Sequence, residues 1–230
     1  MVFVTGDVHC PIDVSKLNRK NFPEQKKLMK DDFLIVCGDM GIVWNNPKSK
    51  AYKEDIYWQK WFSSKSFTTL FVDGNHENFD MLNSYPIEEK WNGRVQKICD
   101  NVYHLMRGEI YTICDKTFFC FGGGSSHDKM YRKEGVSWWP DEIPSYQEVN
   151  YGIEKLNSKN NCVDFIISHC CSDRNQDKIS KYYEKDSLTK YFDFIEDNVK
   201  FSHWYFGHYH EDIEIDDKHT CLYQKIVKVL

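Results

Sequence analysis

The chain has 230 residues, of which 41% are hydrophobic and 16% aromatic, and it carries a net charge of -5. This length fits one large domain, and the apolar content is enough for a sizeable core, which excludes an intrinsically disordered chain. The acidic balance gives no broad basic surface for duplex DNA or for an anionic membrane, although a small positive pocket remains compatible with it.

Short apolar runs rich in β-branched or aromatic residues recur along the chain and predict buried strands. They lie at residues 1–5, 33–37, 69–72, 118–121, 163–167 and 204–206. Helices are predicted between them at residues 22–30, 54–63, 145–156 and 187–198. Pro23 suits the first turn of the first helix, and Ser145-x-x-Glu148 is a capping-box pattern for the third. This alternation indicates an α/β fold.

The C-terminal part has a different pattern. Further strands are expected within residues 102–121, and residues 211–215 and 220–229 look like two strands separated by a turn at residues 216–218. That spacing predicts a terminal hairpin or meander. Because the sequence has no internal repeat and no linker, we expect a single domain over residues 1–230.

The nine cysteines are an odd number and contain no Cys-x-x-Cys pair. Several lie within apolar runs, as Cys37 does, which favours reduced structural thiols in a cytoplasmic protein. No apolar stretch is long enough to span a membrane, and the first strand runs into a polar turn at Gly6-Asp7 rather than into a signal-peptide core. We therefore expect a cytoplasmic protein with no membrane partner.

Five polar clusters each follow a predicted strand directly. They are Gly6-Asp7-Val8-His9, Gly38-Asp39-Met40-Gly41, Gly74-Asn75-His76-Glu77, Ser168-His169 and Gly207-His208-Tyr209-His210. Ligands bind at the carboxyl ends of strands in α/β sheets, so these clusters are expected to meet in one crevice. A Gly-Asp pair alone is usually a turn, and a single histidine is seldom a metal ligand. Five such clusters at five strand ends are hard to explain in that way.

The side chains in these clusters suit divalent metals. Asp, Asn and His offer the hard oxygen and borderline nitrogen donors that Mn, Fe or Zn accept. The candidates number seven, too many for one tetrahedral zinc site and enough for two ions that share a carboxylate: Asp7, His9, Asp39, Asn75, His169, His208 and His210. Two such ions clamp the oxygens of a phosphoryl displacement and lower the pKa of a bound water, so that hydroxide is available near neutral pH.

In their order and content the five clusters resemble the calcineurin-like metallophosphoesterase superfamily. Its pattern is Gly-Asp-x-His, Gly-Asp-x-x, Gly-Asn-His-Asp/Glu, a lone His and Gly-His-x-His, and all five blocks are matched between residues 6 and 210. The resemblance implies a four-layer α-β-β-α sandwich of two mixed sheets flanked by helices, with a dinuclear metal site at one end. Mn is the first expectation for the two ions, with Fe, Zn, Ni and Mg as alternatives.

The resemblance also implies a role for each matched residue. Asp7, His9, Asp39 and His210 would hold the first metal. Asp39 would bridge to the second metal, which Asn75, His169 and His208 would complete. His76 would bind no metal but face the leaving group, where an imidazole can donate a proton or stabilise the transition state.

The substrate class is less clear from the motifs. The Gly-Asn-His-Glu form is also similar to Ser/Thr protein phosphatases and diadenosine tetraphosphate hydrolases, which grip phosphate with two arginines. This chain has Met40-Gly41-Ile42-Val43 and Asp73 at the two corresponding places. Because a guanidinium is needed for a bidentate grip, these replacements argue against a protein phosphatase.

A Gly-rich loop at residues 122–140 offers other contacts. His127 and Arg132 in this loop are candidates for binding substrate, and a mobile surface loop is an equally good interpretation. Trp138 and Trp139 are expected to be buried rather than to stack on a base. Asp73 and Glu77 are candidates for supporting the metal ligands, and Trp44 is a weaker candidate for lining the crevice.

These observations predict a hydrolase of small phosphomonoesters or phosphodiesters, with nucleotides as candidate substrates. A nuclease is the main alternative, and the acidic pI argues against stable binding to duplex nucleic acid. A non-catalytic scaffold is a third hypothesis, but such a protein is expected to have lost metal ligands and this chain keeps all of them.

Overall fold

The computed structural model describes residues 1–230 and contains two β-sheets. The seven-stranded sheet consists of β1 (Val2–Thr5), β2 (Phe33–Val36), β3 (Thr68–Phe71), β4 (Ile87–Lys90), β5 (Gly93–Cys99), β6 (Val102–Leu105) and β13 (Ile226–Lys228). Its spatial order is β13-β1-β2-β3-β6-β5-β4. The central pairs from β1 to β6 are parallel, whereas β13, β5 and β4 pair antiparallel.

The six-stranded sheet consists of β7 (Glu109–Ile113), β8 (Lys116–Phe121), β9 (Phe165–Ser168), β10 (His203–Phe206), β11 (Ile213–Asp216) and β12 (His219–Cys221). Its spatial order is β11-β12-β10-β9-β8-β7. The strands β8, β9, β10 and β12 run parallel to one another, and the edge strands β7 and β11 pair antiparallel with β8 and β12. Both sheets are therefore mixed.

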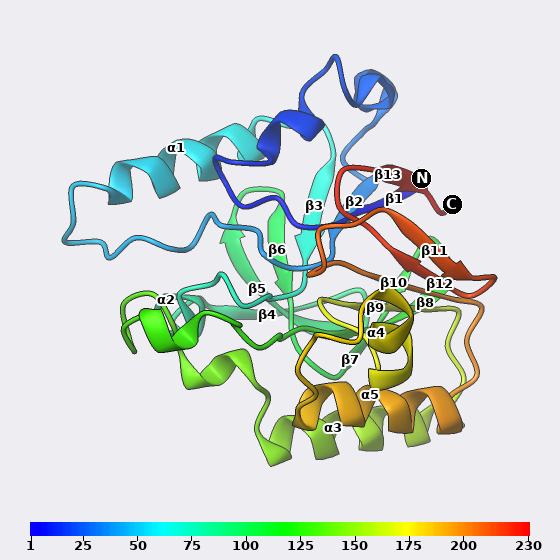
Figure 1. Ribbon diagram of the computed structural model, residues 1–230. Coiled ribbons are helices and arrows are strands. Elements are labelled where there is room, and N and C mark those ends of the chain that lie inside the picture. The colour runs from blue at the N-terminus through cyan, green and yellow to red at the C-terminus, as the bar shows by residue number, and fades with distance from the viewer.

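Helices form the two outer layers (Figure 1). They are α1 (Tyr52–Ser63), α2 (Phe79–Leu82), α3 (Tyr146–Ser158), α4 (Asp173–Ile179) and α5 (Ser187–Asn198). Figure 1 places α1 on one side of the strands and α3 and α5 on the opposite side. The predicted four-layer α-β-β-α sandwich is confirmed. None of these helices combines the length and the apolar character that crossing a membrane requires.

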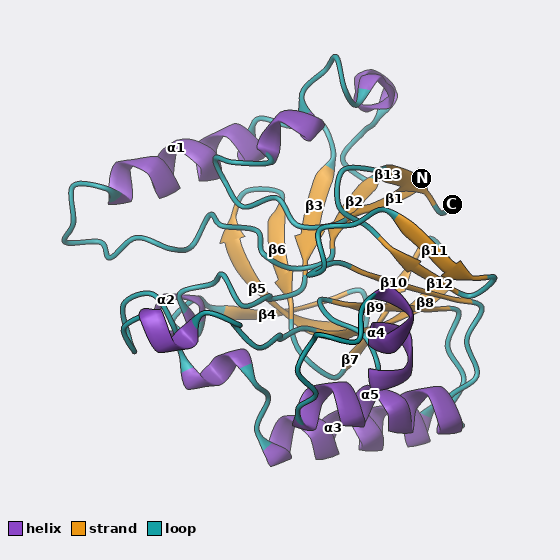
Figure 2. Cartoon of the chain, viewed as in Figure 1, coloured by secondary structure: helices purple, strands orange, loops and turns teal.

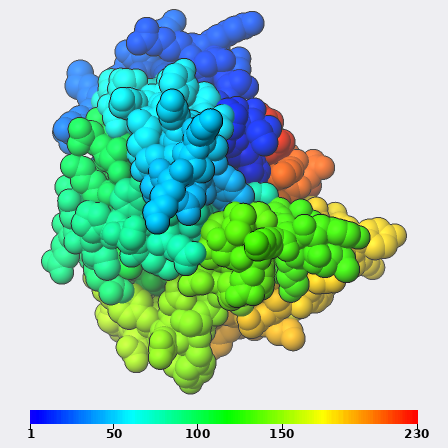
Figure 3. Space-filling view, turned by 90° about the vertical axis from the view of Figure 1, so that its left-hand side faces the viewer, coloured from blue at the N-terminus to red at the C-terminus, as the bar shows by residue number.

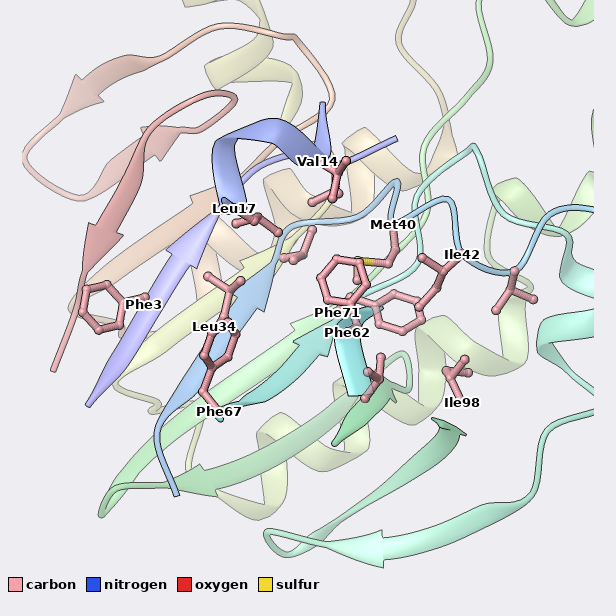
Figure 4. Close-up of a cluster of buried hydrophobic side chains, with 14 of the residues drawn as sticks. Phe3, Val14, Leu17, Leu34, Met40, Ile42, Phe62, Phe67, Phe71 and Ile98 are labelled. Atoms are coloured by element: carbon pink, nitrogen blue, oxygen red, sulfur yellow. The ribbon is translucent and has the colours of Figure 1, made fainter. Parts of the chain in front are cut away.

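Three buried clusters hold the layers together. One lies between the two sheets and includes Ile35 from the first sheet and Phe118 from the second. Another packs the first sheet under α1 and contains Leu34, Phe62 and Phe71; Figure 4 shows the Phe62 and Phe71 rings side by side. The third packs the second sheet against α3 and α5. Burial of apolar surface at about 25 cal/mol per Å² makes these clusters the main source of stability.

Most predicted elements are present, and two helices begin as their sequences indicate. The Ser145 hydroxyl accepts from the Glu148 backbone N–H, and the Glu148 carboxylate accepts in return, so the predicted capping box opens α3. The α5 helix has the predicted bounds and is capped by Asp186. The strands β4 and β5 and the short helices α2 and α4 were not predicted. A long loop without a helix joins β2 to α1 (Figure 2).

The helix predicted at residues 22–30 is wrong in type and length. The structure has a 3₁₀ helix at Pro23–Lys27 instead. The buried side chains here are Phe22, Gln25 and Leu28, which recur every three residues. That spacing matches the three residues per turn of a 3₁₀ helix rather than the 3.6 of an α-helix, which explains the difference.

The predicted C-terminal hairpin is only half correct. The strands β11 and β12 pair antiparallel as expected, but the second predicted strand, at residues 220–229, is divided between the two sheets. After β12 the chain crosses to the other sheet, where β13 pairs with β1. The two termini consequently lie side by side (Figure 1).

Candidate metal centre

The five polar clusters follow the strands as predicted and meet at one end of the sandwich. Three of them follow β1, β2 and β3, which are parallel neighbours, and two follow β9 and β10, which are parallel neighbours in the other sheet. Carboxyl ends of parallel strands share an edge of the sheet, so both sheets deliver their polar side chains to the same place.

Four of the seven candidate ligands have a left-handed backbone, which is uncommon for residues other than glycine. Their φ angles are 38° at His9, 47° at Asp39, 70° at His208 and 53° at His210. Such conformations cost energy and cluster at functional sites, where the surrounding structure holds them. Here each one turns the chain sharply after a strand and directs the side chain toward the cluster.

Two motif glycines leave space that the candidate ligands occupy. A Cβ atom at Gly74 would lie 2.0 Å from Oδ1 of Asp39, and one at Gly207 would lie 2.2 Å from Oδ1 of Asp7. The glycines are therefore needed for close packing of the carboxylates as well as for the turns.

One group of donor atoms brings Asp7, His9 and His210 together. Their ligand atoms lie within 4.8 Å of one another, and Nε2 of His210 is 3.2 Å from Oδ2 of Asp7. Nε2 of His9 also lies 3.0 Å from Oδ2 of Asp39. This is the set that the sequence assigned to the first metal.

A second group adjoins it through the same carboxylate. Nε2 of His169 lies 3.1 Å from Oδ1 of Asn75, 3.2 Å from Nδ1 of His208 and 3.5 Å from Oδ2 of Asp39. Nδ1 of His169 donates to the backbone oxygen of Cys37, which leaves Nε2 facing the other donors. This is the set that the sequence assigned to the second metal, and Asp39 lies between the two groups.

The charges of the cluster are unusual for a buried site. Asp7 and Asp39 are 0% and 1% exposed, and neither forms an ion pair with a lysine or an arginine. Burial alone would lower the pKa of His169 and of His9, but the Asp39 carboxylate raises these pKa values to about 10 and about 9. Burial and the neighbouring charge of His169 lower the pKa of His208 to about 3.

This donor set fits two divalent cations. Two buried carboxylates, an amide oxygen and four imidazoles are the hard and borderline donors that such ions take, and Asp39 can be shared. Without a metal, protons on His9 and His169 supply the positive charge that the carboxylates require. A cation has to displace those protons, so that metal affinity is expected to rise with pH.

His76 lies beside the first donor group. Its backbone N–H donates to Oδ1 of Asp39 over 2.7 Å, and its ring centroid is 5.2 Å from that of His9. Nε2 of His76 is 3.2 Å from Nη2 of Arg132. The guanidinium of Arg132 is further held by Asp128, whose carboxylate lies 2.7 Å from its Nε.

The loop at residues 122–140 therefore reaches the cluster. The bright-green part of the chain, around residues 120–140, projects from the surface in Figure 3. The His127 ring lies 5.5 Å from that of His208, a member of the second donor group, and 5.4 Å from that of Tyr183. Both loop residues singled out from the sequence are thus near the candidate ligands. Trp139 is buried as predicted, and its indole N–H donates to Asp80, whereas Trp138 is only partly buried.

Asp73 and Glu77 are both buried and hold neighbouring loops. Oε1 of Glu77 accepts from the backbone N–H of Met40, next to Asp39. Asp73 accepts from Nε of Arg107 over 2.9 Å, and its backbone oxygen accepts from the N–H of Gly123. Asp73 therefore ties the third motif to the Gly-rich loop through a backbone hydrogen bond, and its carboxylate forms a buried ion pair with Arg107.

Two residues near the cluster were missed by the sequence analysis. Asp13 accepts from Nδ1 of His9 over 2.9 Å, and Tyr223 stacks on His210 with ring centroids 4.7 Å apart. Asp13 lies four residues after His9, a proximity that could have drawn attention to it. No local sequence signal connects Tyr223 to the motifs.

A cavity of about 400 Å³ opens next to the first donor group. His9, His76 and His210 line one part of it, and Ile12, Trp44 and Tyr223 are among the residues that line the rest. Its volume falls within the range of small-molecule sites. A larger cavity of about 560 Å³ lies elsewhere, near Lys225 and Lys228, and contains none of the candidate ligands.

Comparison with known proteins gives one family. The family model described as calcineurin-like phosphoesterase matches residues 1–212 of the chain. None of the curated proteins matches it. The matched range contains all five polar clusters and ends just before β11.

Proposed function

This chain belongs to the calcineurin-like phosphoesterase family, whose members are typically dinuclear-metal phosphoric ester hydrolases, and we propose that it hydrolyses small, nucleotide-sized phosphomonoesters or phosphodiesters. The observation that carries this proposal is the meeting of two donor groups at Asp39. A cavity of about 400 Å³ lies beside the first of these groups. A cavity of that size accommodates a nucleotide-sized ester rather than a protein surface.

The proposed ligand roles follow the two donor groups. Asp7, His9 and His210 hold one divalent ion, Asn75, His169 and His208 hold the other, and Asp39 contacts both. When bound, two such ions polarise the phosphate and make a water molecule acidic enough to act as a nucleophile near neutral pH. Mn²⁺ is the first ion to test, and the same donors accept Fe, Zn, Ni or Mg.

His76 and Arg132 are proposed to act on the substrate itself. Their side chains lie 3.2 Å apart, and His76 lines the cavity, so one phosphate ester can contact both. Arg132 donates to a phosphate oxygen, and a guanidinium makes such charge-assisted bonds well. His76 gives a proton to the leaving oxygen, a role open to a positioned imidazole. In the metal-free protein, burial lowers the pKa of this group. The His127 ring is proposed to contact substrate next to His208.

The position of Asp73 favours a small substrate over a phosphoprotein. Related protein phosphatases place an arginine there, whereas Asp73 of this chain is buried and paired with Arg107. Arg107 also donates to the backbone oxygen of Asp141 and lies 3.3 Å from the carboxylate of Glu148. The Arg107 guanidinium is therefore occupied by contacts within the fold and is not free to bind a phosphate.

The experiment compares hydrolysis of p-nitrophenyl phosphate and bis-p-nitrophenyl phosphate in the presence of Mn²⁺. Preference for the diester assigns the chain to the phosphodiesterases, and preference for the monoester assigns it to the phosphatases. His76→Ala should slow either reaction while Mn²⁺ binding is retained, because His76 binds substrate rather than metal. Full turnover of both esters in excess chelator would contradict the proposal.

A nuclease activity is tested with the same preparation. The net charge of -5 provides little attraction for a polyanion, so binding to duplex DNA should be weak at 150 mM salt. Cleavage of a DNA duplex at a rate above that of the small esters would replace the small-substrate proposal by the nuclease alternative.

A further inference from the structure

The last 18 residues of the chain lie outside the family match and include the crossing from β12 to β13. This crossing passes directly beside the first donor group. The space next to Gly6 is filled by the backbone oxygen of Leu222, and Tyr223 follows immediately. A segment without a family motif therefore contributes to the wall of the metal centre.

Two side chains fix the crossing. The carboxylate of Asp212 accepts from the backbone N–H groups of Tyr223, Gln224 and Lys225 at 2.8, 3.1 and 3.0 Å. The buried ammonium of Lys16 donates to the backbone oxygens of Asp7 and Tyr223. The second contact joins the crossing to the first metal motif. Hydrogen bonds to the backbone N–H and C=O of Tyr223 therefore hold this residue in place.

The Tyr223 side chain contacts His210 directly and reaches His9 through Asp13. Its ring stacks on the His210 ring with centroids 4.7 Å apart and an interplanar angle of 15°. Its hydroxyl donates to Oδ1 of Asp13 over 2.9 Å. Oδ2 of Asp13 is in turn 2.9 Å from Nδ1 of His9.

These contacts determine which nitrogen of His9 faces the donor group. A carboxylate can only accept a hydrogen bond, so Asp13 keeps a proton on Nδ1 of His9, and Nε2 is the nitrogen that can give up its proton to a metal ion. Nε2 is the atom that lies 3.0 Å from Asp39. Contacts of this kind fix the tautomer and the orientation of metal-binding imidazoles.

We propose that Tyr223 is a positioning residue for one of the two metal ions, the one held by Asp7, His9 and His210. This inference rests on the proposed function. Through its ring Tyr223 orients His210, and through its hydroxyl and Asp13 it orients His9, so a single side chain controls two ligands of the same ion. No aromatic stack or hydrogen bond links Tyr223 to the ligands of the second ion.

The test is a calorimetric titration of metal-free protein with Mn²⁺. Tyr223→Phe removes the hydroxyl bond and keeps the ring, and Tyr223→Leu removes both. Loss of such supporting contacts typically weakens metal binding by about 10- to 100-fold. We expect about tenfold weaker binding of one ion in Tyr223→Phe and a larger loss in Tyr223→Leu, with the affinity for the other ion unchanged. The weakened event should be the one that His210→Ala abolishes.

The matched control is Tyr151→Phe. The Tyr151 hydroxyl donates to the Glu109 carboxylate over 2.6 Å, so this variant loses the same type of bond away from the site. It should bind both ions with wild-type affinity. Wild-type affinities in both Tyr223 variants, or an equal loss at both ions, would overturn the positioning role while leaving the proposed function intact. Failure of the wild-type protein to bind Mn²⁺ would instead refute the proposed function, and the positioning role with it.

Discussion

The backbone N–H of His76 donates to Oδ1 of Asp39 over 2.7 Å, and this bond ties the third motif to the second. The other oxygen of Asp39 faces both donor groups, so one carboxylate is used by the metal centre and by the turn that carries His76. A displacement of Asp39 is therefore expected to affect both metal ions and the substrate-facing imidazole together.

Gly74→Ala tests this dependence without changing a ligand. The new Cβ would lie 2.0 Å from Oδ1 of Asp39, which forces the carboxylate to move. We expect affinity for both Mn²⁺ ions to fall by about 10- to 100-fold, the range seen when the support of a metal ligand is lost. Gly135→Asn is the control, because this position is open and asparagine tolerates its φ of 69°. Wild-type Mn²⁺ affinity in Gly74→Ala would contradict the packing described here.

Arg132→Gln tests the proposed phosphate contact. A hydrogen bond to a charged group contributes about 1.5–3 kcal/mol, so the loss should lower kcat/KM by roughly 10- to 100-fold. Arg132→Lys should retain more kcat/KM than Arg132→Gln but less than the wild-type protein, because lysine cannot make the planar, bidentate contact. Arg174→Gln is the control, since Arg174 is half exposed and pairs with Asp193 and Asp197 away from the site. Equal kcat/KM values for Arg132→Gln and the wild-type protein would remove Arg132 from the substrate contacts.

Much of the fold and the donor set could be predicted because the signals are local. Each motif directly follows an apolar run, and the parallel strands bring the motifs together without further information. The 3₁₀ helix at Pro23–Lys27 was missed because its three-residue period is visible only when burial is known.

Long-range contacts at the site could not be predicted in the same way. Tyr223 reaches Asp13 across 210 positions of sequence, and only because the chain changes sheets after β12. Arg132 was a candidate from its loop alone, but its contact with His76 depends on how that loop folds back over 56 positions.

Arg107→Met tests the buried ion pair between Arg107 and Asp73. Removing one partner leaves the Asp73 carboxylate buried without its cation, which typically costs about 3–5 kcal/mol of unfolding free energy. Urea denaturation should show that loss. Lys116→Met serves as the control, because the Lys116–Asp164 pair is partly exposed and should contribute far less. Similar losses of unfolding free energy in the two variants would show that the buried Asp73–Arg107 pair contributes no more than a partly exposed pair.

Glu142 predicts a pH dependence of stability. Burial raises its pKa to about 7 from an ordinary value of 4.5, although its carboxylate accepts from the Ser126 backbone N–H. Because the folded state binds this proton more tightly than the unfolded state, the contribution to stability is complete below pH 4.5 and is lost as the pH rises through 7.

Glu142→Gln removes that titration. In metal-free protein we therefore expect the variant to gain in melting temperature relative to wild type between pH 5 and pH 8. The measurement is the difference between the two melting temperatures at each pH. A difference that stays constant from pH 5 to pH 8 would show that Glu142 does not titrate in this way.

The most direct test of the central claim is the number of divalent ions bound per chain, measured by elemental analysis after dialysis against Mn²⁺ and set beside ester hydrolysis. The account predicts two ions in the wild-type protein, fewer in Asp39→Asn, and loss of hydrolysis when a chelator removes the metal. A wild-type chain that binds no divalent ion, or that hydrolyses phosphate esters equally well in chelator, would contradict it.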